Sequence, residues 1–301
     1  MSEYVHAIAE FDLQQQILER QRINRREHRP FNLNDYTNER CESNFRFDKT
    51  QLCTIIHAME LPSHFVFRAE DPDHRFQVST EEVMAICLRR LAYPARLEDL
   101  GHMFGRTAPA LSVIFNGMIE YLFNKYKSTL NFAESQFTRD RLQLFADAVA
   151  QKGIMLNYRS PISNVVGFID GTVRGICRPV VNQEVVYNGH KYIIITNKNV
   201  SLLCIDDRTS RESLHNQKMS KVRVAVEWEF GRTVNLFAFL DYHKNQKVWL
   251  SPVGAYYFVG VLFKNIKICL GGGQACKYFG IEPPTIYEYL EHGNRVFREQ
   301  Q

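Results

Sequence analysis

The sequence lacks the cysteine pattern of a zinc-binding or disulfide-stapled protein. Its seven cysteines are scattered and form no Cys-x-x-Cys pair, and the closest two, Cys269 and Cys276, have no histidine at zinc spacing. Residues 1–9 are too short and too polar for the apolar stretch of a signal peptide. We therefore expect an intracellular protein whose cysteines are reduced.

Long apolar runs are also scarce. The best candidate for a membrane span, residues 253–270, contains Lys264 and Lys267, and this favours a buried helix of a soluble protein. The composition agrees, because 45% hydrophobic and 23% charged residues are ordinary for a soluble chain. At 301 residues the chain has room for one large or two medium domains.

An excess of one charge is missing as well. The formal net charge is +4, so any surface for nucleic acid has to be local rather than global. Residues 1–30 hold one local cluster toward their end, formed by Arg20, Arg22, Arg25, Arg26, His28 and Arg29. A run of this kind is usually a solvated face; the alternative is a basic arm in which Arg25 and Arg26 contact DNA phosphates.

Residues 31–155 carry apolar side chains at helical spacing. Ser79 is placed to cap a helix with its hydroxyl, and Gly153 is placed to end one. We expect this part of the chain to be all helical. The pattern predicts helices over 47–61, 80–93, 97–104, 108–122 and 139–152.

A helix-turn-helix outline lies inside this region. A short helix over 97–104 is followed by a turn at Gly105-Arg106, and Thr107 caps a longer helix. A plain pair of packed helices with no DNA role fits the same pattern equally well. In the DNA-binding alternative, Arg106 and Ser112 are the candidate contacts to phosphate or base.

The texture changes after residue 160. Short segments rich in Val, Ile and Tyr predict strands over 165–169, 184–187, 192–196 and 201–205, and helices return from Val222. We expect an α+β or α/β fold with four parts along the chain. These are a basic arm over 1–30, a helical region over 31–155, a second domain over 160–280 and a tail over 281–301.

Two acids are placed for a divalent metal site. Asp170 follows an apolar run and precedes a glycine, as at the end of a buried strand, while Glu227 has apolar neighbours at helical spacing. Sites that hold Mg²⁺ use one or two carboxylates and leave the other positions to water and phosphate. Glu229 lies about 200° around the helix from Glu227, so we expect it to face solvent.

Several sequence blocks resemble the DDE endonucleases of the PIF/Harbinger transposase type and the proteins domesticated from them. The blocks keep their order over residues 31–280, and together they are more specific than one short motif. They are LRRLAYPARLEDL (88–100), FGR (104–106), FIDGTVR (168–174), ICRP (176–179), YNGHK (187–191) and MSKVRVAVEWEFG (219–231).

The resemblance implies a helical DNA-binding region followed by an RNase H-like core, a mixed sheet flanked by helices. It implies a nuclear protein with DNA as substrate and a separate DNA-binding protein as a partner. Two aspartates and a glutamate bind two Mg²⁺ or Mn²⁺ ions in this family, and Asp170 and Glu227 match the first aspartate and the glutamate. His190 and Lys191 match a motif that could face DNA phosphate; a hydrogen-bonded loop histidine is the alternative for His190.

The second aspartate is where the chain departs from the family pattern. The family places it in a Gly-Asp-Pro or Gly-Asp-Ser context, late in a long segment, and only a short stretch separates Lys191 from Met219 here. Asp206 and Asp207 end an apolar run but stand in a different context. An internal deletion near 192–218, an alternative splice form or a misassigned exon would each give this shortened copy.

Two functions follow as expectations. The first is a divalent-metal-dependent DNA endonuclease of transposase type, weakened because one metal ligand is missing. The second is a non-catalytic scaffold that binds DNA or a partner protein. An incomplete sheet would also leave strand edges and apolar surface exposed.

Overall fold

A computed structural model describes residues 31–130, 137–155, 165–167, 173–181, 183, 193–195, 228–229 and 231–300. The helices within these residues are α2 (Asn38–Phe45), α3 (Lys49–Ala58), α4 (Thr80–Ala92), α5 (Leu97–Phe104), α6 (Ala108–Leu130), α7 (Arg139–Met155), α10 (Val253–Gly271), α11 (Gln274–Phe279) and α12 (Ile286–Glu299). The short 3-10 helices are η1 (Leu33–Asp35), η3 (Ala238–Leu240) and η4 (His243–Asn245). The strands are β1 (His64–Phe67), β2 (Phe76–Ser79), β3 (Val173–Gly175) and β4 (Ile193–Ile195).

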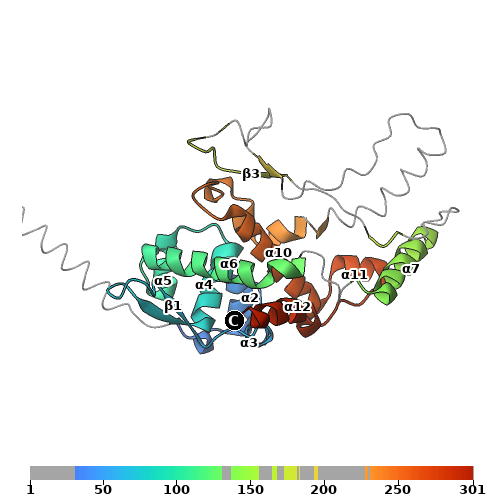
Figure 1. Ribbon diagram of the computed structural model, residues 1–301, viewed down its shortest axis with the longest axis horizontal. Coiled ribbons are helices and arrows are strands. Elements are labelled where there is room, and N and C mark those ends of the chain that lie inside the picture. The colour runs from blue at the N-terminus through green and yellow to red at the C-terminus, as the bar shows by residue number, and fades with distance from the viewer. Residues whose placement is uncertain are drawn as a thin grey trace, which may run out of the picture.

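The described part of the chain is mostly helical with two small sheets, an α+β arrangement (Figure 1). Each sheet is an antiparallel pair: β1 with β2, in the register His64 to Ser79, and β3 with β4, in the register Val173 to Ile195. β4 lies inside a predicted strand, whereas residues 165–167 are not in a strand. Among the described residues, no third strand joins β3 and β4.

The prediction that residues 31–155 are all helical is wrong at the β1–β2 hairpin. Alternate residues of β1 are phenylalanines, and Phe67 is buried against the helical core. The rings of Phe65 and Tyr121 meet edge to face with centroids 5.1 Å apart, which ties the hairpin to α6. Each strand has only four residues, and the polar stretch between them interrupts the alternating pattern, so the sequence did not predict strands here.

The predicted start of α4 is confirmed at its cap. The Ser79 hydroxyl accepts a hydrogen bond from the backbone N–H of Glu82 at 3.3 Å, and α4 ends before Pro94. α3 begins with a capping box, in which Asp48 and Gln51 satisfy each other's backbone N–H groups. Local hydrogen bonding therefore fixes where these helices begin.

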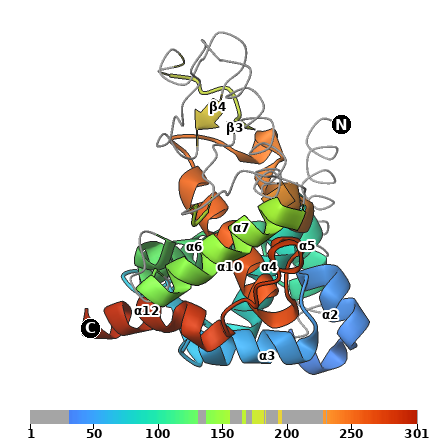
Figure 2. The same cartoon turned by 90° about the vertical axis from the view of Figure 1, so that its right-hand side faces the viewer.

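α6 lies within the helical core, beside α4, α10 and α12 (Figure 2). It contacts α4, α5, α10 and α12. The apolar stripe predicted for it is buried: Leu111, Ile114, Phe115, Met118 and Leu122 all belong to the hydrophobic core.

Residues 281–301 are not a tail, because α12 packs into the same core. Leu290 is fully buried, and the Asn294 amide donates to the Ala58 carbonyl at 2.8 Å. α10 also packs on α6. α10 and α12 thus share one hydrophobic core with the helices before residue 131, and this described core draws on residues 33 to 290.

α10 is long and apolar enough, by length and composition, to cross a membrane. Its side chains Val259, Leu262 and Phe263 instead lie in the core. Lys264 forms an ion pair, and Lys267 donates to the Arg46 carbonyl at 2.7 Å. This packing fits a core helix of a soluble protein, as the two lysines predict.

α7 extends three residues beyond its predicted end at residue 152. Gly153 was expected to terminate the helix, but it lies within α7 and is buried. The ammonium of Lys152 lies 3.8 Å from the centre of the Tyr278 ring, so α7 and α11 are joined by a cation–π contact.

The close approach of α12 to α6 gives the first prediction. A Cβ on Gly293 would lie 2.4 Å from the Tyr126 ring and 2.6 Å from the Thr129 hydroxyl. Gly293→Ala should therefore lower the free energy of unfolding by about 1–3 kcal/mol through overpacking. Urea denaturation of the full chain measures it.

Gly254→Ala is the matched control, since a Cβ there meets nothing within 4 Å. We expect this variant to match the wild type or to gain up to about 1 kcal/mol. Equal stability of the two alanine variants would contradict the α6–α12 contact.

Candidate nucleic-acid interface

The predicted pair of helices over 97–122 forms as a compact hairpin of α5 and α6. Gly105 ends α5 with a φ of 60°, a left-handed conformation that glycine adopts without strain. Thr107 then starts α6, its carbonyl accepting from the Leu111 N–H at 3.0 Å. Leu100 and Phe104 of α5 are buried in the core, so the hairpin outline is confirmed as a packed unit.

Arg106, the predicted DNA contact in this turn, is engaged with another side chain. Its guanidinium meets Glu82 of α4 through two bonds, Nε to Oε1 at 2.5 Å and Nη2 to Oε2 at 2.9 Å. The Arg106 side chain is 20% exposed and that of Glu82 only 7%. This two-pronged pair joins the turn to α4, and a DNA contact by Arg106 remains a prediction.

Ser112, the other predicted contact, lies at a polar relay on α6. The Asn116 amide donates to the Ser112 carbonyl at 2.9 Å, and the Tyr256 hydroxyl donates to Asn116 Oδ1 at 2.6 Å. The relay connects α6 to α10. Ser112 therefore faces a pocket between helices.

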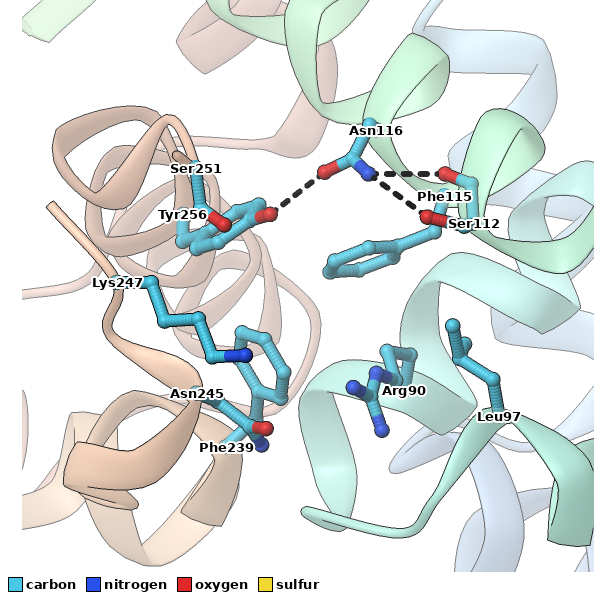
Figure 3. A pocket seen from close by; sticks show the side chains of 10 residues that line it. All are labelled: Arg90, Leu97, Ser112, Phe115, Asn116, Phe239, Asn245, Lys247, Ser251 and Tyr256. Carbon is cyan, nitrogen blue, oxygen red and sulfur yellow. Dashed lines mark hydrogen bonds between the residues drawn. The ribbon is translucent and has the colours of Figure 1, made fainter. Parts of the chain in front are cut away.

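Figure 3 shows this pocket, which we call the Arg90 pocket. It has a volume of about 220 Å³ and lies where α4, α6, α10 and the η3–η4 segment meet. Phe115 and Phe239 supply apolar wall. The polar side chains that line it include Arg90, Ser112, Asn116, Asn245, Lys247 and Tyr256.

The pocket is basic. Arg90 and Lys247 both line it, and none of its described lining residues is acidic. The guanidinium carbon of Arg90 lies 5.0 Å from the centre of the Phe239 ring, a cation–π contact that fixes the side chain. Burial lowers the pKa of Arg90, although an arginine stays charged in proteins.

The remaining predicted site residues lie outside the described part of the chain, so their pairing in space stays a prediction. These residues are Arg25, Arg26, Asp170, His190, Lys191, Asp206, Asp207 and Glu227. Within the described residues, no group of three or more His, Cys, Asp or Glu side chains could hold a metal ion.

Glu229 is described, and the expectation that it faces solvent is wrong. Its Oε2 lies 2.7 Å from Lys264 Nζ on α10, and the two side chains are 22% and 10% exposed. Two partly buried charges of opposite sign hold each other in place. The pair anchors the segment that follows Glu227 to the helical core.

Comparison with protein-family models, with curated proteins and with solved structures gave no significant match. The function has to be argued from the residues.

One feature of the sequence does point to the Arg90 pocket. Arg90 falls on the apolar stripe of α4 with Val83, Ile86 and Cys87, where an arginine is out of place unless something engages it. Lys247 and Asn245 had no such signal, because they belong to an irregular segment far along the chain.

The ion pair of Arg106 gives the second prediction. Arg106→Gln leaves the buried Glu82 carboxylate without its partner, so the free energy of unfolding should fall by about 3–5 kcal/mol. The double variant Glu82→Gln/Arg106→Gln should recover part of this loss, because no charge is left unpaired. Urea denaturation of the three proteins measures the effect.

Arg96→Gln is the control, since it breaks the exposed pair of Arg96 and Asp99 at 3.3 Å and should cost less than about 1 kcal/mol. A loss at Arg106→Gln no larger than that of the control would mean that Arg106 is not a structural residue.

Proposed function

We infer that the chain is a DNA-binding protein on the plan of the PIF/Harbinger DDE transposases, with a weakened divalent-metal-dependent endonuclease activity. The ordered sequence blocks from Leu88 to Gly231 carry this proposal. The first two blocks span the end of α4, α5 and the start of the turn into α6. That hairpin supports a DNA-binding role for the helical part.

In this proposal, Asp170 and Glu227 are the carboxylates that bind Mg²⁺ or Mn²⁺. A bound divalent ion activates water and stabilises the leaving oxygen in phosphodiester cleavage. Their place would be an RNase H-like sheet flanked by helices. Asp206 or Asp207 would have to stand in for the second aspartate, and a site with two carboxylates holds its metals weakly.

The same proposal also implies a substrate, a place in the cell and a partner protein. DNA is the substrate, and His190, Lys191, Arg25 and Arg26 are the residues proposed to contact its phosphates. A chain that acts on chromosomal DNA works in the nucleus. A separate DNA-binding protein would supply target recognition, because phosphate contacts position a duplex without reading its sequence.

A non-catalytic scaffold is the second candidate, and one observation favours it. The stretch between Lys191 and Met219 is too short for the segment that carries the second aspartate in the family. A protein that kept the helical part and lost this carboxylate would still bind DNA or a partner protein.

Nicking of supercoiled plasmid by the purified full chain separates the two functions. With Mg²⁺ or Mn²⁺ present, we expect slow conversion to open circles and its loss on chelation. Asp170→Ala and Glu227→Gln should each reduce the rate by about 100-fold or more, since even residues that only support metal ligands contribute 10–100-fold. Gel electrophoresis over time measures the rate.

Glu291→Gln is the control, because it removes an exposed carboxylate on α12. It should keep the nicking rate of the wild type under conditions where it is folded. Nicking that survives Asp170→Ala would exclude the proposed metal site. DNA binding that weakens with salt, with no cleavage by the wild type, would establish the scaffold.

A further inference from the structure

The Arg90 pocket holds buried hydrogen-bond donors that have no acceptor. Nε and Nη1 of Arg90 and Nδ2 of Asn245 are all buried, and none of them hydrogen-bonds within the described structure. Each unmet donor costs free energy, and more so on a charged group. Native proteins rarely leave buried polar atoms unpaired unless a ligand, an ion or water completes them.

Several acceptors in the pocket wall already accept hydrogen bonds from neighbouring side chains. Asn116 Oδ1 accepts from the Tyr256 hydroxyl, and the carbonyl and hydroxyl of Ser112 accept from the Asn116 amide at 2.9 and 3.4 Å. The Phe239 carbonyl accepts from the Gln246 amide at 2.8 Å. The pocket therefore offers donors to a ligand that brings acceptors.

The charges around the pocket also favour a ligand that carries hydrogen-bond acceptors, namely an anion. Arg90 and Lys247 line the pocket from two sides, and no carboxylate is among the described residues that line it (Figure 3). Glu98 on α5 acts electrostatically on Arg90 but does not line the pocket. The neutral polar side chains Ser112, Asn116 and Asn245 also line the pocket, and they do not repel an anion.

Size limits the anion. The pocket volume of about 220 Å³ lies below the roughly 300–1,000 Å³ of sites for drug-sized ligands. A single phosphate group fits this limit, whereas a whole nucleotide does not. The planar guanidinium of arginine matches phosphate oxygens with two parallel hydrogen bonds.

We propose that the Arg90 pocket binds one phosphate group. Arg90 and Asn245 donate to its oxygens from inside the pocket, and Lys247 adds a second positive charge at the exposed end. The proposal of a phosphate site rests only on the structure of the pocket. Its source in the cell is proposed to be a DNA backbone phosphate, and this second step rests on the proposed DNA-binding function.

Titration of the full chain with inorganic phosphate tests the site, with heat release as the readout. The wild type should bind phosphate, and Arg90→Gln and Lys247→Gln should each weaken the affinity by about tenfold or more, because each removes a charge-assisted bond. Phosphate affinities equal to that of the wild type, or no binding by the wild type, would overturn the proposal.

Two matched controls remove a charge beside the pocket. Arg89 precedes Arg90 on α4 and stacks on Tyr93 with its guanidinium carbon 4.2 Å from the ring centre, outside the pocket. Lys244 lies three residues before Lys247, is exposed, and does not line the pocket. Arg89→Gln and Lys244→Gln should keep the phosphate affinity of the wild type. If the controls lose as much affinity as Arg90→Gln and Lys247→Gln, the net charge of the protein explains the effect and the proposal fails.

Thermal unfolding distinguishes a ligand site from a structural arginine. Without phosphate, Arg90→Gln should unfold at a temperature no lower than the wild type, since it removes unpaired donors. With phosphate, only the wild type and the two controls should gain stability. A large loss of stability in Arg90→Gln without phosphate would make Arg90 structural, and Lys247→Gln, whose side chain is exposed, would then carry the binding test.

A short DNA duplex in place of phosphate identifies the source. If the backbone occupies the pocket, Arg90→Gln should weaken duplex binding, lower its salt dependence by about one charge and abolish competition by phosphate. Unchanged duplex binding together with phosphate binding would assign the pocket to a small free phosphate and overturn the backbone source. Phosphate binding and duplex binding are both measured without nicking, so a failure of the proposed metal site would not affect either result.

Discussion

Buried hydrogen bonds join α6, α12 and the end of α3, and they fix the C-terminal helix on the core. The Tyr126 hydroxyl lies 2.7 Å from Asn294 Oδ1 and 3.2 Å from the Met59 carbonyl, and the Asn294 amide donates to Ala58. All of these groups are buried, and burial raises the pKa of Tyr126, so the phenol remains a donor. Buried polar groups are nearly always paired, so these hydrogen bonds favour the observed placement of α12. Gly293 then allows the helices to approach.

α6 transmits this constraint to the Arg90 pocket. The C-terminal half of the helix carries Tyr126, and the N-terminal half carries Ser112 and Asn116, which form one wall of the pocket. The opposite wall is held by α10, whose Gly260 lies so close to Leu240 that a Cβ would meet its methyl at 2.3 Å. The walls that α4, α6 and α10 supply are therefore built on packed helices, and such elements hold a site more rigidly than loops do.

Sequence reasoning succeeded where local chemistry decides the outcome and failed where distant residues do. Ser79 and the glycine at 105 mark the ends of α4 and α5 through hydrogen bonds or backbone freedom within a few residues. The β1–β2 hairpin and α12 depend on α6, which lies far from them in sequence. The angle from Glu227 around the helix predicts a solvent-facing Glu229, and the ion pair that it makes could not be predicted because Lys264 lies on another helix. The acids Asp170 and Glu227 could be selected only by their motif contexts, and their pairing stays a prediction.

The pocket and the acids answer different questions about function. A phosphate site on the helical part would position DNA without reading its sequence, and both a nuclease and a scaffold need that. Cleavage adds a requirement for metal-bound carboxylates, which Arg90 and Lys247 do nothing to meet. The two candidate functions therefore share the helical part and differ only at Asp170, Glu227 and the missing second aspartate. In this proposal a chain that lost one metal ligand would still bind DNA through the helical part, because Arg90 and Lys247 lie outside the stretch from Asp170 to Glu227.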